Sequence, residues 1–192
     1  MQTEEDRTRL TVISLFAGAG GSSLGYRDAG HDELLAVEFD PHAVECLRNN
    51  FDFPIWDQDI TDLSVERVLE ITGLQPGELD VLDGSPPCQG FSTSGSRSFD
   101  DTRNQLFREY VRLLRGLEPK VFVMENVSGM MKGKMKLIAR DIFKELQDSG
   151  YNVKAKLMNA KYYGVPQSRQ RVIFMGTRLD LGHPPTFPKP TL

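Results

Sequence analysis

The chain has 192 residues, enough for one well-buried domain and too few for two of ordinary size. It holds only two cysteines and no apolar run near the roughly 18 residues of a membrane span, so we expect a soluble, cytoplasmic protein rather than a disulfide-stabilised secreted or membrane protein. Residues 1–96 carry 5 basic and 18 acidic residues, whereas residues 97–192 carry 18 basic and 9 acidic ones. Only the second half could therefore face the phosphates of a nucleic acid. The alternative is that its basic residues simply form solvated helix surfaces.

Apolar, β-branched segments alternate with amphipathic ones along the chain, a pattern typical of a parallel sheet covered by helices. Strands are predicted over residues 11–16, 34–38, 54–57, 79–83, 120–125, 152–158 and 171–176. Helices are predicted over residues 22–29, 41–50, 64–72, 103–116 and 135–149, the last two ended by Gly116 and Gly150 as C-cap glycines.

These elements predict an α/β fold: a doubly wound, mostly parallel sheet of about seven strands. No helix pattern separates the last two strands, so they should form an antiparallel pair. We divide the chain into an N-terminal tail (1–10), one domain (11–178) and a Pro-rich tail (179–192) that is either a linker or a frayed terminus.

The first strand runs into a glycine-rich turn, Phe16-Ala17-Gly18-Ala19-Gly20-Gly21, that opens a helix. Glycines let a backbone approach a ligand closely, and a helix N-terminus offers free N–H groups, although many such turns bind nothing. Glu38 ends the second predicted strand, twenty residues after Gly18, where an acid can accept hydrogen bonds from both ribose hydroxyls of an adenosine cofactor.

Three further residues fit an adenosine site. Phe39 is placed to stack on the adenine, Asp59 to accept its amino group and Ile60 to cover the other ring face. For Asp59 alone, a role as a helix or turn cap is the stronger alternative. The full dinucleotide motif is broken by Ser23, and an acidic half-chain suits a cationic sulfonium, so S-adenosyl-L-methionine is the predicted cofactor.

The second cysteine lies in Gly84-Ser85-Pro86-Pro87-Cys88-Gln89-Gly90-Phe91-Ser92, directly after an apolar strand. The ends of such strands are where open α/β sheets place their chemistry. Two prolines stiffen the approach to Cys88, and the polar stretch 92–104 follows it. This arrangement favours a nucleophile, although a lone loop cysteine is more often structural.

Two polar groups lie at or near the ends of later strands. Glu125-Asn126 ends one strand and should share a sheet edge with Cys88, unless the pair only caps the strand. Arg169 and Arg171 precede the last apolar strand, and their i, i+2 spacing puts both guanidinium groups on one face, as a charged edge strand also would.

Together these motifs resemble the DNA cytosine-5 methyltransferases. The matching segments occur in the order of that family and span residues 12 to about 178: Phe-Ala-Gly-Ala-Gly-Gly at 16–21, Gly-Ser-Pro-Pro-Cys-Gln-Gly-Phe-Ser at 84–92, Glu-Asn-Val at 125–127 and Gln-Ser-Arg-Gln-Arg at 167–171. The resemblance implies an S-adenosylmethionine-dependent, Rossmann-like methyltransferase fold with DNA as substrate and no metal.

The resemblance also implies residue roles. Cys88 is the nucleophile that adds to carbon 6 of a flipped cytosine, and Glu125 holds ring nitrogen 3 and the exocyclic amine. Arg169 and Arg171 steady the base oxygen and the active-site loop, whereas Asn126 braces the cysteine loop. Pro87 belongs with the cofactor contacts of Phe16, Ala17, Gly18, Gly20, Gly21 and the adenosine residues above.

The chain departs from the family pattern at its end, where a recognition domain and a final helical segment would follow residues 179–192. Either this is a fragment or a second polypeptide supplies that half. A bacterial modification methyltransferase is the leading hypothesis. The alternatives are a tRNA cytosine-5 methyltransferase and a non-catalytic cofactor-binding partner subunit.

Overall fold

The computed structural model describes residues 9–87, 105–133 and 135–191. The strands are β1 (Thr11–Leu15), β2 (Asp32–Val37), β3 (Ile55–Trp56), β4 (Val81–Gly84), β5 (Val121–Val127), β6 (Tyr151–Asn159) and β7 (Gln170–Arg178). The α-helices are α1 (Gly21–Asp28), α2 (Pro41–Asn50), α3 (Val65–Thr72), α4 (Gln105–Leu117) and α5 (Met135–Asp148). Among the described residues, no helix is both long and apolar enough to cross a membrane.

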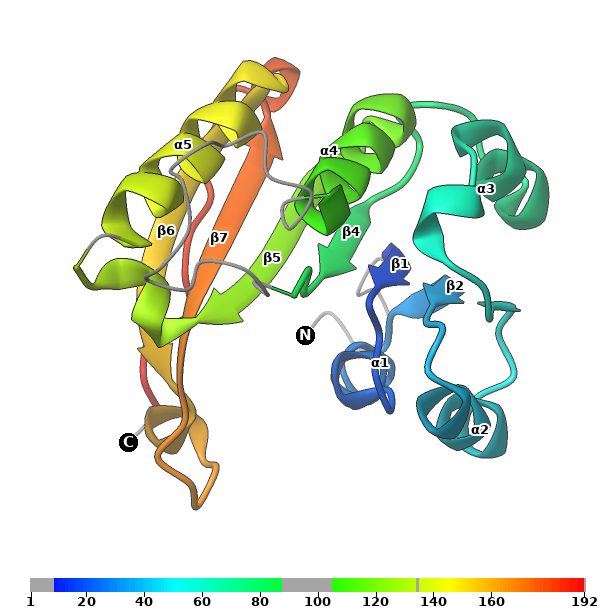
Figure 1. Cartoon of the computed structure of the whole chain (residues 1–192), viewed down its shortest axis with the longest axis horizontal. Coiled ribbons are helices and arrows are strands. Elements are labelled where there is room, and N and C mark those ends of the chain that lie inside the picture. Colours follow the sequence, from blue (N-terminus) through cyan, green and yellow to red (C-terminus); the bar gives the residue numbers. More distant parts are fainter. Residues whose placement is uncertain (1–8, 88–104, 134, 192) are drawn as a thin grey trace, which may run out of the picture.

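The strands form one sheet in the order β3-β2-β1-β4-β5-β7-β6. Strands β1 to β5 pair in parallel, whereas β7 is antiparallel to both β5 and β6. Helices α1 and α2 lie on one face and α3, α4 and α5 on the other, as expected when the chain first winds outward from β1 and then returns to β4 (Figure 1). The predicted doubly wound fold and its antiparallel last pair are confirmed.

The change of winding direction falls between β1 and β4, and this is where the carboxyl ends of the central strands meet. In open α/β sheets, ligands bind in the crevice at such a switch point. The glycine-rich turn leaves β1 there, the segment leading to Cys88 leaves β4, and Glu125 lies near the end of the adjacent β5. The fold thus gathers the predicted site residues at one edge.

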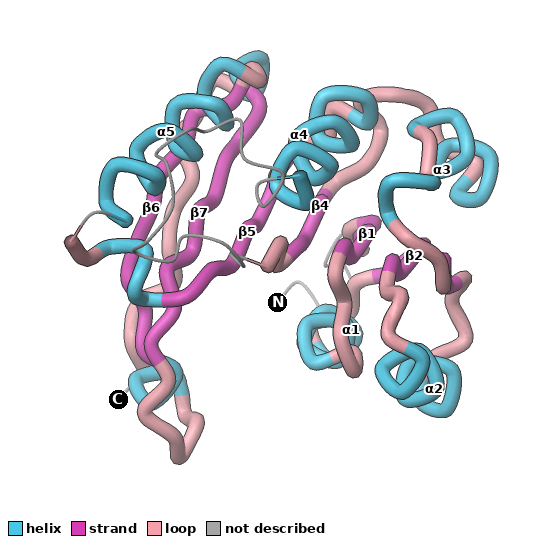
Figure 2. Tube along the Cα trace, in the orientation of Figure 1, coloured by secondary structure: helices cyan, strands magenta, loops and turns pink. Residues whose placement is uncertain are grey.

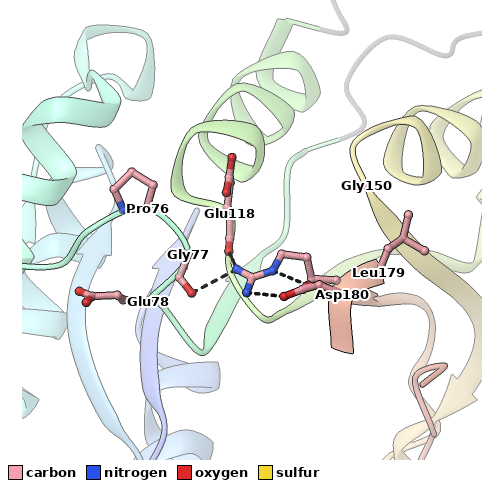
Figure 3. A pocket seen from close by; sticks show the side chains of 8 residues that line it. Pro76, Gly77, Glu78, Glu118, Gly150, Leu179 and Asp180 are labelled. Atoms are coloured by element: carbon pink, nitrogen blue, oxygen red, sulfur yellow. Dashed lines mark hydrogen bonds and ion pairs between the residues drawn. The ribbon is translucent and has the colours of Figure 1, made fainter. Parts of the chain in front are cut away.

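The opposite edge is closed by Arg178, whose guanidinium reaches three other segments (Figure 3). It donates from Nη1 to the Gly77 and Glu118 carbonyls and pairs through Nε and Nη2 with Asp180. An open pocket of about 650 Å³ lies around it. Because this pocket faces away from the predicted site residues and most donors of Arg178 are already used, we assign it a structural role.

The Pro-rich tail packs against the β6–β7 hairpin over residues 183–191. Thr177 Oγ1 donates to the His183 carbonyl near the start of the tail, and Pro185 is buried. At its far end, the Thr191 N–H donates to the Tyr162 carbonyl at 2.9 Å, beside the loop that joins the two strands (Figure 2). The tail therefore leads the chain back toward the edge that carries the site.

One predicted helix end is wrong. Helix α4 continues through Gly116 to Leu117, and the left-handed residue that follows it is Glu118, with φ of 49°. Gly116 instead lies where α4 crosses α3, and a Cβ there would overlap the Val65 side chain. The glycine permits close helix packing rather than a turn. Gly150, with φ of 94°, does end α5 in the predicted left-handed conformation.

We therefore expect Gly116→Ala to destabilise the fold by about 1–2 kcal/mol, since overpacking against a stiff β-branched side chain outweighs the gain in helix propensity. Urea unfolding measures the change. Adding Val65→Ala should restore part of the loss, whereas Gly25→Ala, in open space on α1, should be neutral or stabilising. Equal effects at positions 25 and 116 would contradict the packing argument.

Candidate active site

The turn after β1 has the geometry of a close backbone approach. Phe16, Gly18 and Gly20 all have positive φ, at 57°, 56° and 87°. A Cβ on Gly20 would lie 2.6 Å from the Phe51 ring, whereas Gly18 and Gly21 have open space at the Cβ position. Gly20 is thus required by packing inside the turn, and the other two glycines leave its outer surface free for a ligand.

Glu38 holds this turn to the end of β2. Its Oε2 accepts a hydrogen bond from the Gly18 N–H at 2.8 Å, and its Oε1 accepts from the Phe39 and Asp40 N–H groups at 2.9 Å. The Ala17 N–H also donates to the Val37 carbonyl. A carboxylate has about four acceptor positions, so these bonds leave Glu38 room for a further donor.

The other predicted adenosine residues gather near the ends of β2 and β3 but differ in exposure. The Phe39 ring is 68% exposed and free to stack. Asp59 caps a short helix (Ile60–Asp62) by accepting from the Thr61 N–H and hydroxyl, and these bonds lower the pKa of Asp59. The capping alternative for Asp59 is therefore confirmed. Ile60 belongs to the buried core.

The segment that leads to Cys88 is fastened on two sides. Ser85 donates from its N–H to the Leu15 carbonyl and from its hydroxyl to the Phe16 carbonyl, which joins the segment to the cofactor turn. On the other side, buried Asn126 donates from Nδ2 to the Pro86 carbonyl at 3.1 Å. This is the bracing role predicted for Asn126. Pro87 is exposed, and Cys88 lies outside the described residues.

Glu125 and Arg171 form an ion pair across β5 and β7, with 2.6 Å between Oε1 and Nε. The pairing of Val127 with Arg171 puts Glu125 diagonally opposite the arginine on the same sheet face. Both side chains are about one-third exposed or less, so the pair is accessible from the site edge but partly desolvated.

Arg169 is less constrained. It lies one residue before β7, is exposed, and accepts from the Ala160 N–H through its backbone carbonyl. The sequence predicts that Arg169 and Arg171 share one face of a strand. Only Arg171 lies within β7, because the regular ladder of this strand begins at Gln170. Among the described residues, no group of His, Cys, Asp or Glu side chains could hold a metal ion.

The sequence reasoning missed a buried polar cluster beneath α1. Asp83 of β4 pairs in register with Ser14 of β1, and Glu33 of β2 accepts from the Ser23 hydroxyl of α1 at 3.1 Å. An extra residue in β2, Leu34, shifts the register between Val12 and Ile13 and turns Glu33 to this face. The available signal was Asp83, the one charged residue of the otherwise uncharged strand β4.

Burial governs the ionisation of both carboxyls in this cluster. Desolvation raises the pKa of Glu33 to about 7 and that of Asp83 to about 6, although hydroxyl hydrogen bonds oppose both shifts. Glu33 Oε2 and the Ser14 hydroxyl are both buried, and neither has a hydrogen-bond partner of good geometry, although the Ser14 hydroxyl still opposes the rise in the pKa of Glu33. A protonated Glu33 would supply the missing donor, which agrees with its raised pKa.

Since the pKa of Glu33 is raised above its unfolded value, the folded state holds a proton that the unfolded state loses, and stability falls as pH rises from about 4.5 to above 7. We expect the free energy of unfolding of the wild type, relative to Glu33→Gln, to fall by roughly 2 kcal/mol between pH 5 and pH 8, after allowance for partial exposure.

Urea denaturation at a series of pH values measures this difference. Asp32→Asn, which removes an exposed carboxylate from the same strand, is the matched control. A pH-independent difference between the wild type and Glu33→Gln would show that Glu33 does not retain its proton in the folded state.

The fold and site define an α/β domain with a glycine-rich turn, a braced proline segment and a Glu–Arg pair at one sheet edge. A family model described as C-5 cytosine-specific DNA methylase matches residues 10–191. The chain belongs to this family, as the sequence motifs predicted.

Individual relatives of the chain are Type II methyltransferases by name. The chain is 42% identical over 189 residues to the Type II methyltransferase M.XorII of Xanthomonas oryzae pv. oryzae, covering 96% of this chain and 44% of that protein. It is 42% identical over 190 residues to the Type II methyltransferase M.AquIA of a Picosynechococcus strain, covering 94% and 76%.

A solved E. coli structure, of a prophage-encoded protein assigned as a DNA modification methyltransferase, matches with a TM-score of 0.76 and 34% identity. The match covers 94% of this chain and 52% of that protein. The chain thus spans about half the length of M.XorII and of this structural relative.

Proposed function

We propose that this chain is the catalytic portion of a DNA cytosine-5 methyltransferase of a bacterial Type II modification system, acting in the cytoplasm. The observation that carries the proposal is the edge where Asn126 holds the Pro86 carbonyl, two residues before Cys88, beside the Glu125–Arg171 pair. Pro86 follows β4, Glu125 lies on the adjacent β5 and Arg171 on β7. The family membership supports the proposal that Cys88 is the nucleophile, Glu125 the acid and Arg171 the cation.

S-adenosyl-L-methionine is the proposed cofactor, and it supplies the methyl group from its sulfonium. The open outer surface of Gly18 and Gly21 fits a backbone-contacted ligand, and Glu38 presents a fixed carboxylate beside it. Exposed Phe39 offers an aromatic face nearby. We assign Phe16, Ala17, Gly20, Asp59, Ile60 and Pro87 to the lining of the same site.

The proposed chemistry begins with Cys88. Its thiolate adds to carbon 6 of cytosine, and the electron pair of the carbon 5–carbon 6 bond makes carbon 5 nucleophilic toward the methyl group. Loss of the carbon 5 proton then re-forms the double bond and expels the thiolate. A stacked cytosine cannot reach this edge, so the base is flipped out of the duplex.

Glu125 and Arg171 would act on the base rather than on the methyl group. Glu125 is proposed to hold ring nitrogen 3 and the exocyclic amine and to lend a proton as the thiolate adds. The 2.6 Å contact with Arg171 fixes the orientation of Glu125. Arg169, exposed next to the strand, is proposed to reach the base oxygen and the Cys88 segment.

Specific DNA recognition needs groove contacts beyond this domain. Because relatives such as M.XorII are about twice as long, we propose that a recognition domain, continuing the chain after its tail or supplied by a second polypeptide, completes the enzyme. The tail ends beside the hairpin loop at the site edge, which is a suitable point of attachment.

We expect Cys88→Ala to abolish methyl transfer while cofactor binding survives, because the thiolate enters only the chemical step. Transfer of labelled methyl to DNA measures this, with the chain alone and with the polypeptide encoded downstream. The chain alone should turn over little.

A second readout uses DNA that contains 5-fluorocytosine, which should trap the active wild-type enzyme as a denaturation-resistant adduct, since fluorine blocks the last elimination. The Cys88→Ala protein should form no adduct. Methylation by the Cys88→Ala protein would overturn the assignment.

We expect Glu38→Ala to weaken S-adenosylmethionine binding about ten-fold or more, as the loss of charge-assisted hydrogen bonds worth about 1.5–3 kcal/mol requires. Titration calorimetry measures the affinity, and thermal unfolding checks that the turn survives. Glu45→Ala, which removes an exposed acid from α2, is the control and should bind normally. Unchanged affinity in a folded Glu38→Ala protein would limit Glu38 to holding the turn.

A further inference from the structure

The β6–β7 hairpin carries charge of one sign only. Between Asp148 and Asp180 the sequence contains no acidic residue and six Lys or Arg residues. Two of these are already engaged: Arg171 pairs with Glu125 and Arg178 with Asp180. The remaining four are Lys154, Lys156, Lys161 and Arg169.

The register of the sheet decides which way these charges face. Lys154 pairs with Met175 and Lys156 with Ile173, and Ile173 in turn pairs with Glu125. Directly paired residues lie on the same face, so both lysines share the face of the Glu125–Arg171 pair. Helix α5 covers the opposite face, where Tyr151 and Val153 are buried.

The three lysines are exposed and face no carboxylate within the described part of the chain. Two of them lie over aromatic rings instead: Lys156 Nζ is 5.7 Å from the centre of Phe187 in the tail, and Lys161 Nζ is 4.8 Å from the centre of Tyr162. These contacts restrain the side chains while leaving their charges available to a ligand.

The hairpin also extends beyond the carboxyl ends of β4 and β5 (Figures 1 and 2). Its loop therefore projects past the edge from which the Cys88 segment leaves the sheet. Lys154 and Lys156 are two residues apart in an antiparallel strand, an advance of about 7 Å. The charges of one DNA strand repeat about every 3.4 Å along the helix axis, so this advance matches about two phosphates measured along that axis.

We propose that Lys154, Lys156 and Lys161, the hairpin lysines, bind the phosphate backbone of the duplex that flanks the target cytosine. This inference rests on the proposed function, and it adds a surface that holds DNA without reading its sequence. Lysine suits this role because its ammonium is a compact charge that contacts phosphate without a fixed bidentate geometry.

The test compares two triple variants of the full chain. Lys154→Gln, Lys156→Gln and Lys161→Gln together remove the hairpin lysines. Lys136→Gln, Arg140→Gln and Lys144→Gln remove the same charge from exposed positions on α5, on the opposite face. Fluorescence anisotropy with a labelled random-sequence DNA duplex, across a salt titration, gives the affinity and its salt slope.

We expect the hairpin variant to lose about ten-fold or more in affinity at low salt, and its slope of log Kobs against log salt to become shallower by about 2–3. The α5 variant should keep most of its affinity and slope. Equal losses in both variants, or none in the hairpin variant, would overturn the proposal. Thermal unfolding of both variants verifies that they are folded.

Two further measurements separate the possible failures. If the hairpin variant fails only to assemble with the polypeptide encoded downstream, as judged by size-exclusion chromatography, and keeps its salt slope, the surface binds protein and the proposal is wrong. If instead Cys88→Ala still methylates DNA while the hairpin variant loses its slope, the proposed chemistry fails and the DNA surface stands.

Discussion

Ser85 is the residue on which the two halves of the candidate site depend. Its two hydrogen bonds, to the carbonyls of Leu15 and Phe16, join the segment leaving β4 to the turn leaving β1. Glu38 holds the glycine-rich turn to the end of β2, and Asn126 holds the segment after β4 to β5. Each bond uses a backbone group that a loop at a sheet edge would otherwise leave to solvent. The spacing between the turn, where the cofactor is proposed to bind, and the segment that leads to Cys88 is thereby set by the register of four parallel strands.

The polar cluster beneath α1 adds a second constraint on the same turn. A helix of eight residues cannot be positioned by its own propensity, so it depends on contacts with the sheet. Here those contacts include hydroxyls of α1 and two carboxyls, and burial raises the pKa of Glu33 to about 7 and that of Asp83 to about 6. A carboxyl that takes up a proton avoids most of the cost of burying charge, and its hydrogen bonds still hold α1 in one docked position.

The uneven charge of the chain has a structural counterpart. Several acidic residues of the first half lie in β2 or just after it, and one of them, Glu38, holds the turn where a cationic cofactor is proposed to bind. Lysines of the second half that pair with no carboxylate of the described residues lie on the hairpin face that also carries Glu125 and Arg171. The two ligands proposed for this domain, one cationic and one polyanionic, would thus meet surfaces of opposite sign. The electric fields of these two surfaces would attract each ligand before either one is bound, because the fields arise from the charges of the protein itself.

The sequence by itself determined the element order, the doubly wound sheet and the motifs of the site, because periodicity, glycine turns and strand-end polar residues are local properties of the chain. It also indicated the bracing role of Asn126 and the capping alternative for Asp59. Contacts between distant segments were decided only by the tertiary structure. The sequence predicts a helix end at Gly116, yet this glycine lets α4 pack closely against Val65 of α3. No local sequence pattern encodes the point where two helices cross.

Glu33 shows the same limit for the site. A single extra residue in β2 reverses its side-chain direction, since the period of a strand is two, and places it beside Ser14 and Asp83 from two other strands. Its burial, and with it the raised pKa, exists only once those three strands are in register beneath α1. Strand pairing and burial depend on residues far apart in the chain, and for that reason only the folded protein could reveal them.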